Sequence, residues 1–511
     1  MKLELLTDRY EKKISGVLGC FDRLIIQGDL PRINYPKGME WHLYKNDILI
    51  FDYPKYAQSI RDELKEYVGN LAKSHGLRPI DGNRRGVNKE DIAASELKKK
   101  KEKNGGEGEE VKGLFCIIWA MESCPSFKPM YDNKNKRVYL KYQERQCLHY
   151  YFYFMDDYLG LCFVRVPTWL PFRLKVYFNG HNWLASRLEE EGIGYKMLDN
   201  AFFSIEDFER AQEISDSFDV KKLHKFLDQF AQIYCPLYKY FCDSYHWSIL
   251  QVEYATDIVF RRQKDLQEIY QNLVETAIHT VKPENIATFL GRKLDGRYKG
   301  EMGNNYQIRL EGNRIKHMMG PVSIKMYDKY QQILRIETTA NDIRFFKHYR
   351  KVDKKDGTTP IKFTSMKKYI YSIVPLIELM KASNRRYLEF ISVIEDKRLG
   401  CKRLVKVTKR VKKNSRGYRG INFFAEGDIS ILKIVSRAEF NISGFRNKDI
   451  RRRLPSKNNG QISRLLKRLR LHGLIKKAGR TYKYYLTKLG KYVALTAMKI
   501  RELVITPALN Y

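Results

Sequence analysis

Hydrophobic and polar positions follow one another along the chain in patterns that predict both strands and helices. Residues 16–28, GVLGCFDRLIIQG, carry β-branched and aromatic side chains between glycines, which predicts a strand, and a helical pattern follows at Tyr56–His75. Residues 113–171 are strand-like again, and Asp156–Gly160 separates two aromatic and β-branched runs there, which predicts a hairpin. The pattern therefore predicts an α/β fold of the mixed α+β kind.

Helical periodicity dominates the middle of the chain. It covers residues 180–192, continues over 204–280 and returns at 365–393. Residues 321–337, PVSIKMYDKYQQILRIE, interrupt it with two strand-like runs around a turn near Tyr330–Gln332. We expect these segments to belong to one large mixed domain.

The C-terminal part predicts three helices and a hairpin. A short helix is expected at Asp428–Arg437, a second from Asn447, and a third at Gln461–His472, followed by Gly473 as the helix-ending glycine. Residues 474–487, LIKKAGRTYKYYLT, form two strand-like runs around Ala478–Arg480. The third helix places its apolar side chains on one face and its cations on the other positions: Ile462, Leu465, Leu466 and Leu469 against Arg464, Lys467, Arg468 and Arg470.

This order of helices followed by a hairpin, over residues 425–495, resembles the winged helix–turn–helix domains of MarR-type and related regulators. The resemblance implies that the third helix enters the major groove of duplex DNA, where Arg464 and Arg468 are the candidates for base edges. Lys467 and Arg470 share that helix, and the hairpin implies phosphate contacts from Lys477, Arg480 and Lys483. The family pattern is specific for the fold and says little about the target sequence.

A chain of 511 residues exceeds the roughly 250–300 at which a single core stops growing, which predicts several domains. Polar, aperiodic segments suggest the boundaries. We expect an N-terminal α/β segment (1–82), a charged mobile loop or linker (83–112), a large mixed α+β domain (113–400), a basic tether (401–424) and a winged helix–turn–helix DNA-binding domain (425–511).

The net charge is +36, and it is unevenly distributed. Residues 401–511 contain 29 Lys and Arg against 5 Asp and Glu, so +24 of the charge lies in that segment. A localised surplus of this kind favours a polyanionic partner, with duplex DNA first. RNA is an alternative partner, because Tyr482, Tyr484 and Tyr485 could stack on its bases. A protein–protein role for this domain is a further alternative, and the chain could also form a homodimer.

Several classes of protein are disfavoured. The N-terminus is charged where a signal peptide needs an apolar run, and no apolar stretch is long enough to span a bilayer, so we expect a cytoplasmic protein without membrane contact. The 8 cysteines form no CxxC pair, which gives no basis for a zinc site. Phosphate-binding loops of the GxxxxGK[ST] and GxGxxG kinds are absent from the sequence, so ATP-driven and dinucleotide chemistry have no support.

Carboxylates on strand-like runs are the candidates for chemistry. Asp22, Asp157 beside Asp156, and Glu337 are the strongest, because two or three of them brought together could hold Mg²⁺ for phosphodiester cleavage, as in ribonuclease H-like nucleases and transposases. Each also has a structural explanation. Glu337 could pair with Arg335 or a cross-strand lysine, and the aspartates could simply make a turn.

The text K-x-Y-D-K followed by L-R-x-E, at residues 325–337, resembles phage and plasmid replication initiators. The resemblance implies a tyrosine nucleophile on a DNA phosphate with a metal held nearby, and Tyr327 is the matching position. The His-hydrophobe-His metal motif of such proteins is missing here.

Phe345–Arg350 is basic and aromatic, which suits either a binding surface or a solvated helix end. A DNA-binding C-terminal part on a large basic body suggests a mobile element as the source.

Overall fold

The computed structural model describes residues 4–84, 86, 88–104, 111–241, 243–294, 298–309, 312–395, 398–479, 481–506 and 509. The chain forms two compact units, Met1–Glu395 and Asp396–Tyr511. Both contain helices and strands, so the mixed α+β prediction is confirmed. No helix among the described residues is long and apolar enough to cross a bilayer.

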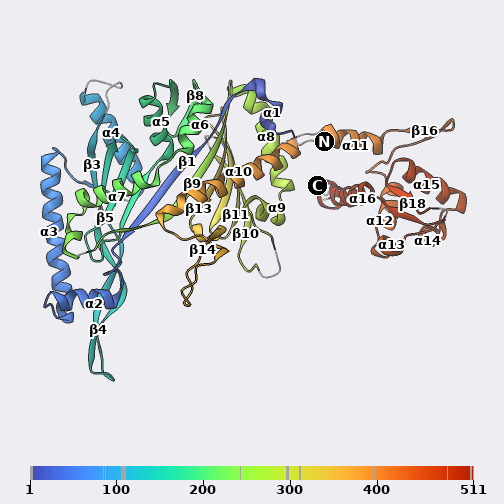
Figure 1. The fold of residues 1–511 in the computed structure, drawn as a ribbon. Coiled ribbons are helices and arrows are strands. Elements are labelled where there is room, and N and C mark those ends of the chain that lie inside the picture. Colours follow the sequence, from blue (N-terminus) through green and yellow to red (C-terminus); the bar gives the residue numbers. More distant parts are fainter. Residues whose placement is uncertain are drawn as a thin grey trace. The chain divides into compact units, whose positions relative to one another are not determined.

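An 11-stranded sheet organises the first unit (Figure 1). All its described strand pairs are antiparallel except that of β2 with β3, and β1 lies in the interior of the sheet between β9 and β6. In spatial order the strands are β10 (Met302–Arg309), β11 (Gly312–Met319), β12 (Val322–Lys329), β13 (Ile333–Ala340), β9 (His246–Phe260), β1 (Ile14–Asp29), β6 (Leu174–Phe178), β5 (Gly160–Pro167), β4 (Arg137–Asp156), β3 (Gly113–Asp132) and β2 (Ile80–Asp81).

Helices and two small hairpins complete this unit. The hairpins pair β7 (Tyr195–Leu198) with β8 (Ala201–Ile205), and β14 (Lys347–Lys351) with β15 (Ile361–Ser365). The helices are α1 (Leu6–Arg9), α2 (Pro36–Lys45), α3 (Tyr53–Ser74), α4 (Lys89–Asn104), α5 (Gly180–Glu190), α6 (Phe208–Asp216), α7 (Val220–Tyr234), α8 (Gln263–Thr280), α9 (Pro283–Phe289) and α10 (Ile373–Glu395).

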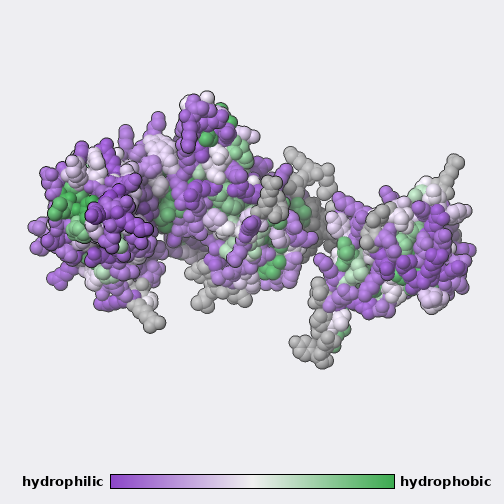
Figure 2. Space-filling view, turned by 90° about the horizontal axis from the view of Figure 1, so that it is seen from below, coloured by the Kyte–Doolittle hydropathy of each residue, from purple (hydrophilic) through white to green (hydrophobic). Residues whose placement is uncertain are grey.

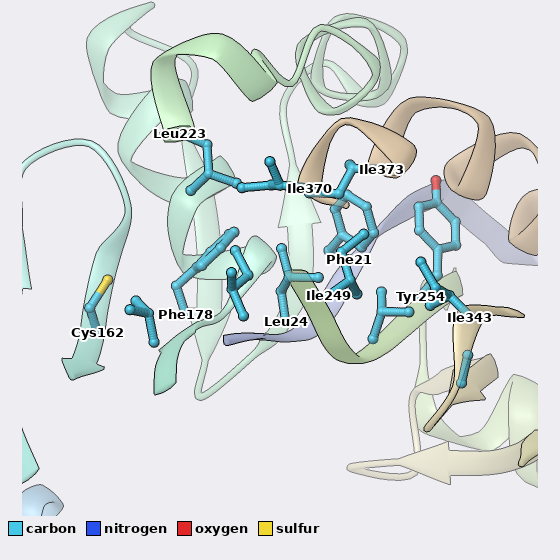
Figure 3. Close-up of a cluster of buried hydrophobic side chains, with 14 of the residues drawn as sticks. Phe21, Leu24, Cys162, Phe178, Leu223, Ile249, Tyr254, Ile343, Ile370 and Ile373 are labelled. Atoms are coloured by element: carbon cyan, nitrogen blue, oxygen red, sulfur yellow. The ribbon is translucent and has the colours of Figure 1, made fainter. Parts of the chain in front are cut away.

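The main hydrophobic core lies between one face of the sheet and the helices that cross it, among them α7 and α10 (Figure 1). Figure 3 shows Phe21 and Leu24 of β1 with Ile249 and Tyr254 of β9, close to Ile373 at the start of α10. Because strand side chains alternate between faces, Arg23 and Glu253, which stand next to Leu24 and Tyr254 in the sequence, point to the opposite face. That opposite face carries the polar residues described below.

The structure corrects three expectations about this unit. Residues 1–82 are not a separate domain, because β1 pairs with β6 and β9, which begin only at Leu174 and His246. Much of the segment expected as a mobile loop is the helix α4, which packs on β3. The stretch 204–280 is not helical throughout, since β9 runs through it. The hairpins predicted at Asp156–Gly160 and Tyr330–Gln332 are confirmed.

The second unit has its own hydrophobic core. Two short hairpins, β16 (Val411–Lys413) with β17 (Arg416–Tyr418) and β18 (Ile475–Lys477) with β19 (Tyr484–Leu486), accompany its helices, and Phe445 forms a single bridge to Tyr484 of β19. Gly473 ends α15 with φ at +75°, as its position predicted. The elements in order are α11 (Arg398–Thr408), β16 (Val411–Lys413), β17 (Arg416–Tyr418), α12 (Glu426–Val435), α13 (Ala438–Ser443), α14 (Asn447–Arg451), α15 (Asn459–Leu471), β18 (Ile475–Lys477), β19 (Tyr484–Leu486) and α16 (Lys488–Ile500).

The segment expected as a basic tether, 401–424, is structured and belongs to this second unit. Val407 of α11 and Ile421 are buried in its core. His472, at the end of α15, lies 2.9 Å from the Lys406 carbonyl oxygen and 3.0 Å from that of Arg419. These contacts hold the basic segment against α15, so its charge is presented from a folded surface.

Candidate functional site

Three carboxylates meet on the face of the large sheet opposite the main hydrophobic core. They are Asp22 of β1, Glu253 of β9 and Glu337 of β13, and one oxygen atom of each lies within 4.8 Å of the others. The pairing of β1 with β9 shifts register between Phe21 and Arg23, which makes Asp22 the extra residue of a β-bulge. Bulges redirect side chains and are frequent beside active sites. Strands far apart in the sequence thus bring three acidic side chains together.

Residues of β12 and β13 surround the Glu337 carboxylate. The Lys325 ammonium lies 2.5 Å from Glu337 Oε1 and 3.5 Å from Glu253 Oε1. The Tyr327 hydroxyl donates to Glu337 Oε2 at 2.7 Å, and Thr339 Oγ1 lies 3.1 Å from Glu337 Oε1. Burial and the neighbouring Glu337 charge raise the pKa of Tyr327 well above its usual value, so its hydroxyl keeps its proton near neutral pH.

Arg335 binds two buried aspartates, Asp22 of β1 and Asp257 of β9. Its guanidinium is fully buried and forms two 2.6 Å hydrogen bonds with Asp257, and its Nη1 lies 3.2 Å from Asp22 Oδ1. Burial alone would raise the pKa of both aspartates, but the Arg335 guanidinium and His181 lower them below the usual value. Arg335 therefore keeps Asp22 ionised and oriented toward the cluster.

The three-carboxylate cluster has a remaining demand for positive charge. Burial and the neighbouring Glu337 charge raise the pKa of Glu253 even though Lys325 acts against them. An all-oxygen set of one aspartate and two glutamates is what hard divalent cations such as Mg²⁺ and Mn²⁺ prefer. The residues present therefore fit such an ion, with Lys325 beside it as a fixed positive charge.

A cavity of about 1020 Å³ opens next to the cluster. Asn179 and Asn200, which contact Asp22, line it together with Arg23. Phe163 and Tyr177 also line it, and their rings stack with centroids 5.0 Å apart. The cavity therefore borders the cluster on the Asp22 side, and none of the three carboxylates lines it.

The structure gathers three of the four catalytic candidates that the sequence supplied. Asp22, Glu337 and Tyr327 come together, whereas Asp157 does not. Its side chain is 80% exposed at the β4–β5 turn, 3.3 Å from Lys112, as the turn explanation anticipated. The lysine partner considered for Glu337 is also present, since Lys325 pairs with it across β12 and β13. Sequence reasoning missed Glu253 because it expected a helix there.

A second candidate surface lies on α15 and the β18–β19 hairpin of the second unit. Arg464, Lys467 and Arg470 are exposed on α15, Lys477 is exposed on β18, and Lys483 is partly buried. Arg480 lies outside the described residues. Figure 2 shows a predominantly hydrophilic surface over this unit. Several of the proposed DNA-contacting cations thus face solvent.

Arg468 does not belong to that surface. Its side chain is 7% exposed and is hydrogen-bonded to the buried Asp428 of α12. Asp428 also accepts from the Arg419 guanidinium at 3.2 Å and from the Asn422 backbone at 2.9 Å. The expected contact between Arg468 and a base edge is therefore wrong, because this cation stabilises the interior of its unit.

Comparisons of the chain with protein-family models, with curated proteins and with solved structures found no match.

Proposed function

We propose that this chain binds DNA and acts on its phosphodiester backbone with a divalent metal ion. The convergence of Asp22, Glu253 and Glu337 within 4.8 Å is the observation that carries the proposal. Lys325 and Arg335 compensate part of the charge of these buried carboxylates, and the raised pKa of Glu253 indicates that the cluster favours further positive charge. The basic surface of the second unit supplies a matching attraction for a polyanion.

In this proposal the residues divide into metal ligands and positioning residues. Asp22, Glu253 and Glu337 would hold the ion, which when bound supplies positive charge against the phosphate oxygens. Arg335 orients Asp22, and Lys325 fixes the Glu337 carboxylate while its ammonium faces the same region. The phosphate would approach along the neighbouring cavity, where Arg23 offers a further cation.

Cleavage of labelled DNA in the presence of Mg²⁺ or Mn²⁺ tests this proposal. Glu253→Gln and Glu337→Gln keep the shape of each side chain and remove its charge, so we expect each to lower the metal-dependent rate at least about 100-fold. Asp157→Asn is the matched control, because it also removes one carboxylate but lies away from the cluster. Equal losses in all three variants would contradict the proposed site.

The second unit, in this proposal, is a winged helix that binds duplex DNA. The order of α14, α15 and the β18–β19 hairpin supports it, together with the exposed cations of α15. RNA recognition through the tyrosines is less favoured, because Tyr484 packs against the core of the unit and Tyr485 is partly buried, so that of the three only Tyr482 is exposed.

Reversing charge on the exposed face of α15 is expected to weaken duplex binding. We predict that Arg464→Glu with Lys467→Glu lowers the affinity about 10- to 100-fold at moderate salt, and reduces the dependence of affinity on salt, since fewer counterions are released. Fluorescence anisotropy of a labelled duplex measures both. Lys433→Glu with Lys499→Glu makes the same change in net charge elsewhere on the unit, and a similar effect from this control would remove α15 from the interface.

Strand transfer to a tyrosine, as in replication initiators, is a second candidate function. The 2.7 Å hydrogen bond from Tyr327 to Glu337 favours it, because the carboxylate is placed to accept the phenolic proton during attack on a phosphorus atom. The Tyr327 oxygen would form a new bond to phosphorus while a deoxyribose oxygen leaves as a hydroxyl. The two functions share one site and differ in whether the protein stays attached to the DNA.

A further inference from the structure

The hairpin of β14 and β15 exposes three large hydrophobic side chains. Tyr349 is 74% exposed, Phe363 59% and Ile361 66%. Tyr349 pairs with Phe363 and Lys351 with Ile361 across the two strands, so these residues share one face of the hairpin. The hairpin extends away from the large sheet (Figure 1). An apolar surface of this kind on a projecting element indicates a binding surface.

The surroundings of these rings are strongly basic. Residues 347–368 contain 8 Lys and Arg against 2 Asp, and Lys347, Lys351 and Lys362 are all exposed. Lys347 and Lys351 flank Tyr349 on the same face. Two aromatic rings between lysines combine a stacking platform with an electrostatic attraction for phosphates. This combination favours a nucleic acid over an apolar protein segment or a neutral ligand.

The hairpin is also held in a defined position. The Ile249 amide of β9 donates to the Lys368 carbonyl oxygen at 2.6 Å, and the His246 and Tyr369 rings stack with centroids 4.9 Å apart. These contacts fix the base of the hairpin to the start of β9, the strand that carries Glu253. β13, which carries Glu337, leads into β14 through a short connection. The rings are therefore mounted on the same framework as the carboxylates.

We infer that this hairpin binds unpaired bases of the DNA strand, which stack on Tyr349 and Phe363 while the lysines contact the adjoining phosphates. This inference rests on the proposed action on DNA and names its substrate as single-stranded in that region. Bases within a duplex expose only their edges in the grooves, whereas an unpaired base offers a whole face to an aromatic ring. The hairpin thus contributes a contact separate from the second unit.

Cross-strand packing of Tyr349 on Phe363, whose ring centroids are 5.2 Å apart, is the alternative use of these rings, since such pairs stabilise hairpins. The variants are chosen to separate the two uses. Tyr349→Val with Phe363→Val keeps the high strand propensity of both positions and removes the rings. Tyr349→Phe keeps a ring. Tyr44→Ala with Leu49→Ala removes two exposed apolar side chains from another part of the unit.

The experiment measures binding of the full chain to a labelled 20-nucleotide poly-dT strand and to a duplex of the same length, by fluorescence anisotropy without added metal. We expect the double valine variant to lose about 10- to 100-fold in affinity for the single strand, with the duplex affinity largely retained. Tyr349→Phe and the Tyr44/Leu49 variant should bind both as the unaltered chain does. Unchanged single-strand affinity in the valine variant, or an equal loss for both DNA forms, would overturn the inference.

The same assay separates this inference from the proposed function. Glu253→Gln should bind the single strand normally and fail only in metal-dependent cleavage. Cleavage by the unaltered chain together with normal single-strand binding by the valine variant would reject the hairpin alone. If the unaltered chain binds the single strand through the two rings but cleaves no DNA, the hairpin inference is supported and the metal site is rejected.

Discussion

Replacing Tyr327 by phenylalanine is expected to abolish covalent attachment of the chain to cleaved DNA, a loss of roughly a thousandfold or more if Tyr327 is the nucleophile. The change removes one oxygen atom, so the strand and its packing should remain. Incubation with a labelled oligonucleotide and Mn²⁺, followed by denaturing gel electrophoresis, measures attachment, because only a covalent protein–DNA bond survives denaturation.

The control for this experiment is Tyr44→Phe, an exposed tyrosine of α2 that belongs neither to the carboxylate cluster nor to the β14–β15 hairpin. It should form the covalent product at the normal rate. If Tyr327→Phe still yields cleaved DNA but the unaltered chain never yields an attached product, water is the nucleophile and the simple nuclease is the correct function. An attached product from Tyr327→Phe would show that another residue performs the attack.

The second large effect concerns Arg335, whose loss we expect to destabilise the first unit. Arg335→Met leaves Asp257, 1% exposed, and Asp22, 7% exposed, without the guanidinium that compensates them. Breaking a buried ion pair from one side costs about 3–5 kcal/mol of unfolding free energy. Urea unfolding followed by tryptophan fluorescence measures it cleanly, since all 5 tryptophans lie within residues 41–247 of this unit.

Arg344→Met provides the matched comparison. Arg344 also pairs with an aspartate, Asp342, at 2.6 Å, but its side chain is 64% exposed. Solvent screens such a pair, so its loss should cost under about 1 kcal/mol. Similar unfolding midpoints for the two variants would mean that the Arg335 network contributes little to the stability of the unit.

Local patterns in the sequence were sufficient to predict many helices and strands, but not how these assemble into one sheet. Helices α3, α5 and α15 and the β12–β13 hairpin were predicted because their periodicity or turn residues lie within a short segment. The position of β1 inside the sheet was not predicted, because its partners β9 and β6 are distant in the sequence. β9 itself was hidden between helices, although Val252, Tyr254, Thr256 and Ile258 follow a period of two.

The candidate site was foreseen in part for the same reason. Asp22, Glu337 and Tyr327 stand out as polar residues in strand-like text, so residue type and local context identified them. Their convergence depends on the register of non-local strand pairs and on a bulge at Asp22, which a single sequence does not specify. Arg468 shows the opposite error. It was grouped with the exposed cations, but the helix turns it toward the buried Asp428.

Calorimetric titration of Mn²⁺ into the full chain tests the central claim most directly, because it asks whether the three carboxylates bind a metal ion before any DNA is involved. We predict one site per chain in the unaltered protein and in Asp157→Asn, with affinity lowered at least about tenfold in Asp22→Asn and in Glu253→Gln. Failure of the unaltered chain to bind Mn²⁺, or binding that these two substitutions leave unchanged, would contradict the proposed metal site.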